Sequence, residues 1–273
     1  MRTKCLYLTL VPFLVLAVTA CVEPKEKEVK TNKEVESFLG TQPDVTMWNS
    51  AATYVTLSSQ AEVDAFSCET GILDANLVIG DISGSDIRDL SKLACLTRIN
   101  GLLQISGTRI ADLRGLHRIR AVKAGIQIDQ NPYLQRLDGL GALDSMGGYF
   151  YLSNNDQLTS LAGLGPLTHI DAVAIFDNDQ LQTLEGLERI RTIGHAQEWF
   201  VNLHVAANKS LRSLQGLGEL REVRGGMWIT DNPALVSLDG INLLDEVTGS
   251  VVLKKNGRLE DREGKVWQKK EIK

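Results

Sequence analysis

The stretch ITDNPALVSLDGI, residues 229–241, decides the fold. It places apolar residues at Ile229, Leu235, Leu238 and Ile241, and the segment leading into Ile229 alternates as a strand does. The later apolar residues recur every three positions, which suits neither a strand nor a long α-helix. A short strand followed by a period of three predicts one coil whose short straight faces meet at corners.

The same pattern recurs along the chain. We call the central inward apolar residue of each strand its anchor; successive anchors are separated by 26, 23, 24, 23, 30, 24 and 24 residues. In five units a glycine follows the anchor after eleven residues and is itself followed by Leu or Ile. Repeats of roughly 20–50 residues are typical of stacked coils with one continuous core. The anchors are Ile79, Ile105, Ile128, Leu152, Ile175, Val205, Ile229 and Leu253.

An asparagine follows each anchor by three positions from Ile128 onward. A buried Asn at a corner can bond backbone groups of its own coil and of the next one, which the turn would otherwise leave without partners. We therefore predict a structural asparagine ladder. Its members are Asn131, Asn155, Asn178, Asn208, Asn232 and Asn256.

These patterns predict a mainly β protein: a right-handed parallel β-solenoid, or β-helix, of leucine-rich coils of about 24 residues over residues 51–260. Thr53–Leu57 alternates like a strand, and Ser59 precedes Glu62 at capping-box spacing, so a short capping helix is expected over 60–66. Residues 261–273 are expected to form a charged tail or cap.

The chain opens with a positive start and an apolar run, as secretory signal peptides do, and we assign residues 1–20 to a signal peptide. The ending Val18-Thr19-Ala20-Cys21 resembles the lipobox of bacterial lipoproteins, in which the cysteine is lipidated. The alternative is a cleaved signal with an unmodified Cys21. Residues 21–50 then read as a lipidated cysteine and a charged tether, with a short helix over residues 33–39 as the alternative.

Loss of Arg2 and Lys4 with the signal peptide changes the formal net charge from −5 to −7, which argues against a nucleic-acid partner. By resemblance to Gram-negative lipoproteins, Val22 rather than Asp at the second mature position implies the outer membrane. The membrane is therefore expected as a partner through the lipid anchor, at the cell envelope or cell surface.

Cys68 and Cys95 remain once Cys5 is removed and Cys21 is lipidated. In an oxidising compartment they favour a disulfide, and no ligand spacing around them indicates a metal site.

The repeat resembles the receptor L domain, the leucine-rich β-helical module of insulin and epidermal growth factor receptors. The residues that carry the resemblance follow the form I-x-G-x-L-x-I-x-x-N-x-x-L-x-x-L-x-G-L-x-x-L over about residues 55–260, and Cys68 lies where the family's first coil begins. Because the receptors' cysteine-rich modules, transmembrane helix and kinase are missing, the resemblance implies the fold and not the signalling role. The chain is more similar to bacterial surface lipoproteins with such repeats.

Metal and catalytic signals are weak. Asn154–Asp156 and Asp177–Asp179 look like calcium ligands, but their central asparagines belong to the ladder and the acidic spacing of a calcium loop is missing. The four histidines have no acid–base partner at motif spacing, and the outward strand positions are poor in carboxylates. We therefore expect no metal, no cofactor and no catalysis.

The outward positions instead predict a surface for a protein or glycan ligand, because exposed aromatic patches mark partner sites. The alternative is that the 194–202 insertion folds over these rings and buries them. The candidate binding residues are Tyr151, Phe176, Trp199, Phe200, His204 and Trp228.

The expected function is that of an envelope-anchored, non-catalytic recognition module. A structural or adhesion protein without a discrete ligand is the second hypothesis, and a β-helical polysaccharide-active enzyme is the third.

Overall fold

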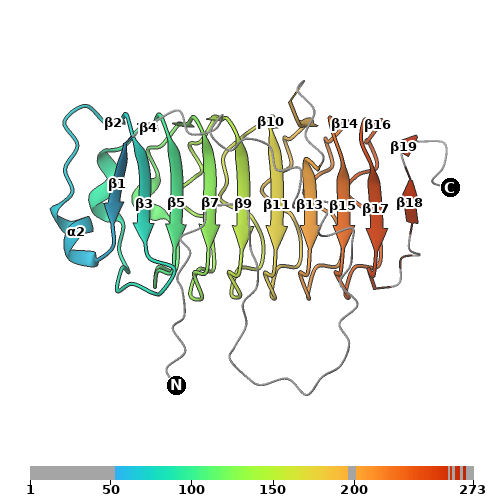
Figure 1. Cartoon of the computed structure of the whole chain (residues 1–273), viewed down its shortest axis with the longest axis horizontal. Helices are drawn as coiled ribbons and strands as arrows, with labels where there is room; N and C mark the ends of the chain where they lie inside the picture. The colour runs from blue at the N-terminus through green and yellow to red at the C-terminus, as the bar shows by residue number, and fades with distance from the viewer. Residues whose placement is uncertain (1–52, 196–200, 258, 260–261, 265–266, 269–273) are drawn as a thin grey trace, which may run out of the picture. The chain divides into compact units, whose positions relative to one another are not determined.

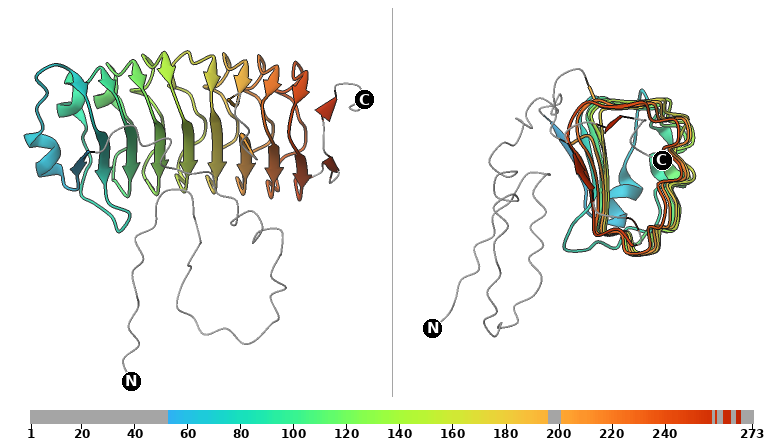
Figure 2. Two further views of the ribbon diagram at one scale, coloured as in Figure 1. Left: turned by 45° about the horizontal axis from the view of Figure 1, so that its top comes forward. Right: turned by 90° about the vertical axis from the view of Figure 1, so that its right-hand side faces the viewer.

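The computed structural model describes residues 53–195, 201–257, 259, 262–264 and 267–268. Over these residues the chain is a β-solenoid, as the repeat predicts, and its strands lie side by side along the long axis (Figure 1). Seen along that axis, successive coils nearly superimpose (Figure 2). Among the described residues, no helix is long and apolar enough to cross a membrane.

The largest sheet has ten strands: nine come from successive coils, and the tenth belongs to the C-terminal tail. Parallel pairing runs from β1 to β17, and the eight predicted anchors form one unbroken register from Ile79 to Leu253. Every anchor is at most 2 % exposed. The strands are β1 (Tyr54–Leu57), β3 (Asn76–Gly80), β5 (Leu102–Ser106), β7 (Gly125–Asp129), β9 (Tyr149–Ser153), β11 (Ala172–Phe176), β13 (Leu203–Ala206), β15 (Met227–Thr230), β17 (Val251–Lys254) and β18 (Arg262–Gly264).

Two further sheets of two-residue strands form another face of the tube, where the period-3 leucines and isoleucines turn inward. One sheet comprises β2 (Ile72–Leu73), β4 (Arg98–Ile99), β6 (Ala121–Val122) and β8 (Ser145–Met146). The other comprises β10 (His169–Ile170), β12 (Thr192–Ile193), β14 (Glu222–Val223), β16 (Glu246–Val247) and β19 (Trp267–Gln268). The 3-10 helices η2 (Ser91–Cys95) and η3 (Arg114–Leu116) occupy early coils.

The N-terminal end is closed as predicted. Helix α2 (Gln60–Ala65) begins with a capping box in which Ser59 accepts from the Glu62 N–H and the Glu62 carboxylate accepts from the Ser59 N–H. Strand β1 is a full member of the large sheet, with Leu57 paired to the anchor Ile79. The first coil therefore starts one strand earlier than the repeat count indicates.

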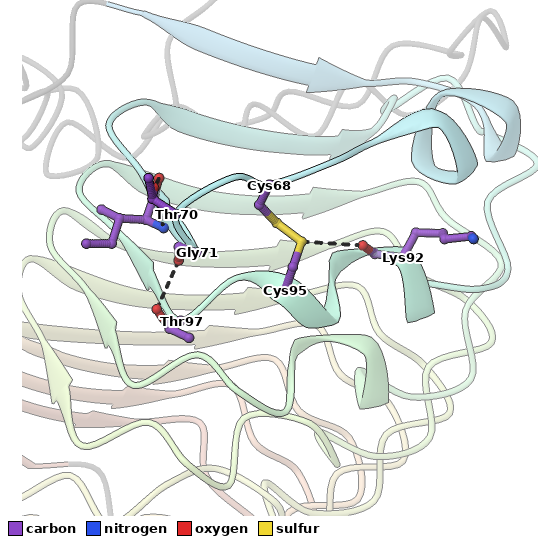
Figure 3. The surroundings of a disulfide bond; sticks show 7 residues. Cys68, Thr70, Gly71, Lys92, Cys95 and Thr97 are labelled. Carbon is purple, nitrogen blue, oxygen red and sulfur yellow. Dashed lines mark hydrogen bonds between the residues drawn. A yellow bond between two sulfur atoms is a disulfide. The ribbon is translucent and has the colours of Figure 1, made fainter.

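A disulfide joins Cys68 to Cys95 at the end of η2, with Cα atoms 6.0 Å apart (Figure 3). Beside it, the Thr97 hydroxyl donates to the Gly71 carbonyl at 3.0 Å. The disulfide thus ties the chain after the capping helix to the next coil.

At the C-terminal end, β18 pairs antiparallel with β17 and β19 pairs antiparallel with β16. Part of the predicted tail, residues 261–273, thus extends both sheets and covers strand edges that a solenoid would otherwise leave open. Parallel stacking ends here because the chain turns back on itself.

The asparagine ladder runs through the corner after each strand from Asn131 to Asn256, and every member is buried. In the Asn155 rung the side-chain amide donates to the carbonyls of Ser153 and Ile128 at 2.9 and 3.0 Å. Its Oδ1 accepts from the backbone N–H of Asn131 at 3.3 Å. The Asn155 side chain therefore bonds one carbonyl of its own coil and one carbonyl of the preceding coil. It also accepts from the backbone N–H of Asn131, the ladder asparagine of that preceding coil.

Residues immediately before the ladder asparagines have left-handed backbone angles, with φ between 51° and 57°. This conformation turns the chain sharply enough to point the next side chain into the core. The residues concerned are Gln130, Asn154, Asp177, Ala207, Asp231 and Lys255.

Candidate functional site

The outer face of the ten-stranded sheet carries a ring row, which we define as Tyr151, Phe176, His204 and Trp228. The four rings come from β9, β11, β13 and β15. Ring centroids are 5.9 Å apart between Tyr151 and Phe176 and 4.5 Å apart between Phe176 and His204. His204 and Trp228 follow at 5.6 Å. The separate sequence positions therefore form one continuous row.

The strand register explains why Phe176 belongs to the ring row although it is not paired with the other three residues. Tyr151, Ala174, His204 and Trp228 stand opposite one another on neighbouring strands, and Phe176 lies two residues after Ala174. The small side chain of Ala174 leaves room between Tyr151 and His204. Phe176 fills it and meets His204 edge-on, an arrangement that aromatic pairs favour.

Accessibility differs along the row. Tyr151 is only 7 % exposed, and its neighbour Tyr149 is 5 % exposed. Phe176, His204 and Trp228 are half-buried. In this structure Tyr151 is therefore a packed ring, and the ligand-facing part of the row is limited to the other three residues.

The ends of the row are held by polar contacts. The Trp228 indole N–H donates at 3.0 Å to the hydroxyl of Ser250, the residue that precedes β17. At the Tyr149 end, the Tyr149 hydroxyl is 3.5 Å from Gln127 Oε1, and Gln127 in turn donates to Asp129 at 3.2 Å. These bonds fix ring orientation across several coils.

Two titratable groups on this face have shifted pKa values. Burial lowers the pKa of His204 to about 4, and the nearby Asp231 carboxylate offsets the effect in part. Burial raises the pKa of Asp129, against the hydrogen bonds that it accepts from Ser106 at 2.5 Å and from Gln127. His204 is thus a neutral aromatic ring at pH 7, and it behaves in the row as a packing group.

Among the described strands of the ten-stranded sheet from β3 to β17, Asp129 is the single carboxylate at an outward position. A glycosidase of the usual kind needs two carboxyl groups that flank the scissile bond. The central strands of this face do not supply that pair.

The structure shows a histidine–carboxylate pair that the sequence interpretation missed. His169 Nε2 lies 2.9 Å from Asp171 Oδ1, and the Gly148 N–H donates to Asp171 Oδ2 at 2.8 Å. Burial raises the pKa of Asp171, but these two hydrogen bonds and the charges of His169 and His195 together outweigh burial, and the net pKa is lowered. The signal available in the sequence is the two-residue spacing of His169 and Asp171, which matches no known catalytic motif.

Asn202 lies near this pair and donates from its amide to the Asp171 carbonyl at 2.9 Å. Among the described residues, its buried Oδ1 has no hydrogen-bond partner. Within the same part of the chain no nucleophile is hydrogen-bonded to His169, so these residues do not form a triad of the kind that activates a serine or cysteine.

The apparent calcium motifs serve the scaffold. Asn155 and Asn178 point into the core as ladder rungs, and Asp179 forms an ion pair with Lys209 at 2.6 Å. Over the part of the chain that the structure describes, no group of three His, Cys, Asp or Glu side chains is arranged to hold a metal ion.

Some predicted residues lie outside the described part of the chain. These are Trp199 and Phe200 of the 194–202 insertion, the lipidation candidate Cys21, and the rest of the 1–20 and 21–50 segments.

Comparisons with known proteins give no relative: no family model, no curated protein and no solved structure matches the chain. The functional argument therefore depends on the geometry above.

Proposed function

We propose that this protein is a non-catalytic recognition module held at the cell envelope by a lipid on Cys21, with its ligand surface on the outer face of the ten-stranded sheet. The observation that carries the proposal is the ring row, in which Phe176, His204 and Trp228 are half-buried and in mutual contact. Aromatic side chains at a partly exposed face are the groups that most often dominate binding energy.

The scaffold favours binding over chemistry. The rings of the row project from strands in fixed register, and the buried asparagine ladder holds the corners that follow these strands. The rings are therefore pre-organised and lose little conformational entropy when a ligand binds. In the described part of the ten-stranded sheet from β3 to β17, only the buried Asp129 supplies a carboxylate, which ranks a polysaccharide-active enzyme below a binding protein.

The resemblance to receptor L domain-like bacterial lipoproteins belongs to the same proposal. It is supported by the predicted coil length, the matching solenoid and a disulfide that closes the entry to the first coils. The signal peptide, the lipid and the outer-membrane location remain inferences from residues 1–22.

The binding test uses the full chain and the variants Phe176→Ala and Trp228→Ala. Binding to isolated cell-envelope fractions should weaken at least about tenfold in each, because truncating a central aromatic costs roughly 2 kcal/mol or more. Ile72→Ala is the control, since Ile72 is 46 % exposed on β2, away from the ring row. Unchanged binding together with a lowered melting temperature would mean that the rings serve packing alone.

The anchor has its own test. Cys21→Ala should move the protein from the membrane fraction to the soluble envelope fraction and abolish incorporation of a radiolabelled fatty acid. Retention in the membrane fraction without the label would contradict lipid anchoring at this residue.

A structural role without a ligand predicts a different result. If the ring row joins two copies, Trp228→Ala should convert dimers to monomers in analytical ultracentrifugation. Wild-type chain that stays monomeric at high concentration would remove this alternative.

A further inference from the structure

A concave site lies at the N-terminal end of the solenoid, and none of its lining residues belongs to the ring row. The segment Asp81–Asp86 projects after β3 and runs beside the corners that follow β5 and β7. Between them is a cavity of about 700 Å3, within the range of small-molecule sites, roughly 300–1,000 Å3. We call it the corner groove.

The corner groove exists because the ladder is interrupted here. The position three residues after the anchor Ile79 is Ile82, which is 66 % exposed, and the next corner has Thr108 in place of asparagine. Thr108 still donates to Asn131 Oδ1 through its N–H at 3.0 Å and its hydroxyl at 2.6 Å. The corner after β3, at residues 81–86, therefore turns outward, whereas the described corner after β5 remains bonded to the ladder.

The segment is held rigidly in this position. Asp81 accepts from the Ser83 N–H at 2.7 Å, and the Ser85 N–H donates to the Gly107 carbonyl at 2.7 Å. A Cβ on Gly107, where φ is +60°, would come within 1.8 Å of the Asp81 carbonyl oxygen. Direct backbone contact thus seats one wall of the groove against the next corner.

The walls combine an exposed ring with polar groups of both signs. Tyr133 is 50 % exposed and lines the groove beside Pro132, and Gln130 lies on the same wall. Asp86 and Arg109 both line it, so their formal charges cancel. Arg109 has no ion-pair partner among the described residues, and Asp86 uses only Oδ1, which accepts from the Gln60 N–H at 2.9 Å.

This composition selects among ligand classes. An extended peptide needs main-chain groups to pair with, but the N–H groups of Ser83, Gly84 and Ser85 are all bonded within the protein. An anion would meet Asp86 as well as Arg109. A neutral saccharide instead presents an apolar ring face for Tyr133 and hydroxyls that both donate to a carboxylate and accept from a guanidinium.

We propose that the corner groove binds a neutral saccharide, with Tyr133 stacking on a sugar ring and Asp86, Arg109 and Gln130 bonding its hydroxyls. The corner groove shares no residue with the ring row, so ligand binding at the ring row and saccharide binding in the groove can be tested independently.

The test is a binding screen of the full chain against neutral oligosaccharides built from glucose, galactose, mannose and N-acetylglucosamine, with uronic-acid oligomers as a charged arm. At least one neutral oligosaccharide should bind in isothermal titration calorimetry. Tyr133→Ala should weaken that binding about tenfold or more, and Arg109→Ala about threefold or more.

Matched controls are Val236→Ala, which truncates an apolar residue that is 53 % exposed elsewhere, and Arg118→Ala, which removes an exposed arginine outside the groove. Both should bind as the wild type does, and so should Trp228→Ala. Hydrogen exchange should slow on ligand addition in residues 81–86 and 130–133, a readout that does not depend on any variant.

Three results would overturn the inference. They are no binding to any neutral oligosaccharide, tighter binding to the uronic-acid oligomers, and binding that Trp228→Ala abolishes while Tyr133→Ala leaves it intact. The last result would move saccharide recognition to the ring row.

Discussion

The chain turns differently at the corner after β3 and at the corners that follow β7 to β17 in the ten-stranded sheet. From Asn131 onward, a buried asparagine bonds two coils at each corner, and the preceding residue adopts a left-handed turn. At the first corner the equivalent residue, Ile82, is exposed, and residues 81–86 leave the regular path. Where the ladder runs the surface is regular, and where it stops a groove opens.

The two regions also differ in what stabilises them. The regular coils repeat the same buried hydrogen bonds from one unit to the next, as a solenoid with nearest-neighbour coupling does. The first coils instead have a capping helix and the disulfide between Cys68 and Cys95. The disulfide thus stabilises the first coils, where the asparagine ladder is missing among the described residues.

The largest effect is expected from breaking the ladder. Asn155→Ala should destabilise the protein by about 3–5 kcal/mol. It removes the amide's hydrogen bonds to the Ser153 and Ile128 carbonyls, each contributing about 0.5–1.5 kcal/mol, and it leaves the buried Asn131 N–H without its side-chain acceptor, which costs about 1–3 kcal/mol. Chemical denaturation measures the change. The equivalent substitution at the first corner, Ile82→Ala, should stay within about 0.5 kcal/mol, and equal losses at both positions would refute the contrast.

Removing the disulfide should have the next largest effect, and a local one. Cys68→Ala with Cys95→Ala should cost about 3–4 kcal/mol for a loop of 27 residues in the chain-entropy model. Hydrogen exchange should speed up in β1 and β3, with β13 and β15 unchanged, because solenoid coils couple mainly to their neighbours. Uniform loss of protection along the solenoid would argue that the first coils and the ladder region unfold together.

A smaller effect concerns the ring row and pH. Folding lowers the pKa of His204 to about 4, below its unfolded value of about 6.5, so the unfolded state binds the proton first as pH falls. The stability due to the neutral ring is therefore complete above about pH 6.5 and is lost between about pH 6.5 and 4. The loss is about 1–3 kcal/mol, allowing for the partial exposure of the residue.

His204→Phe should flatten that part of the stability profile by the same amount in denaturation experiments between pH 7 and 4. Trp228→Phe is the control, since it alters the adjacent ring contact and removes no titrating group. A profile that keeps its full slope in His204→Phe would place the acid sensitivity at another group.

The smallest effect tests the left-handed turns of the regular corners. Ala207 has φ of 57°, which favours glycine, so Ala207→Gly should stabilise the protein by up to about 1 kcal/mol in thermal denaturation. Gly218→Ala is the reverse control: its Cβ meets nothing within 4 Å and its φ is outside the left-handed range. That variant should change stability by less than about 0.5 kcal/mol. Destabilisation by Ala207→Gly would show that this corner is not strained.

The sequence predicted the solenoid because its constraints repeat. The anchor position, from Ile79 to Leu253, has the same buried environment in every coil, because each coil packs on a nearly identical neighbour. For the same reason, the buried role of the ladder asparagines and the capping box at Ser59 and Glu62 could be predicted before any coordinates. The ring row could be proposed from the register alone.

The tertiary structure decided what happens where the repeat varies. The burial of Tyr151, the pairing of His169 with Asp171, and the entry of Phe176 beside Ala174 depend on how neighbouring coils fill space at one place. The corner groove needs residues 81–86, 107–109 and 130–133 to meet, and no period in the sequence links them. Periodic positions in the sequence indicate the environment that all coils share. A binding site depends on the place where one coil differs from the others, and that difference is created only by packing in three dimensions.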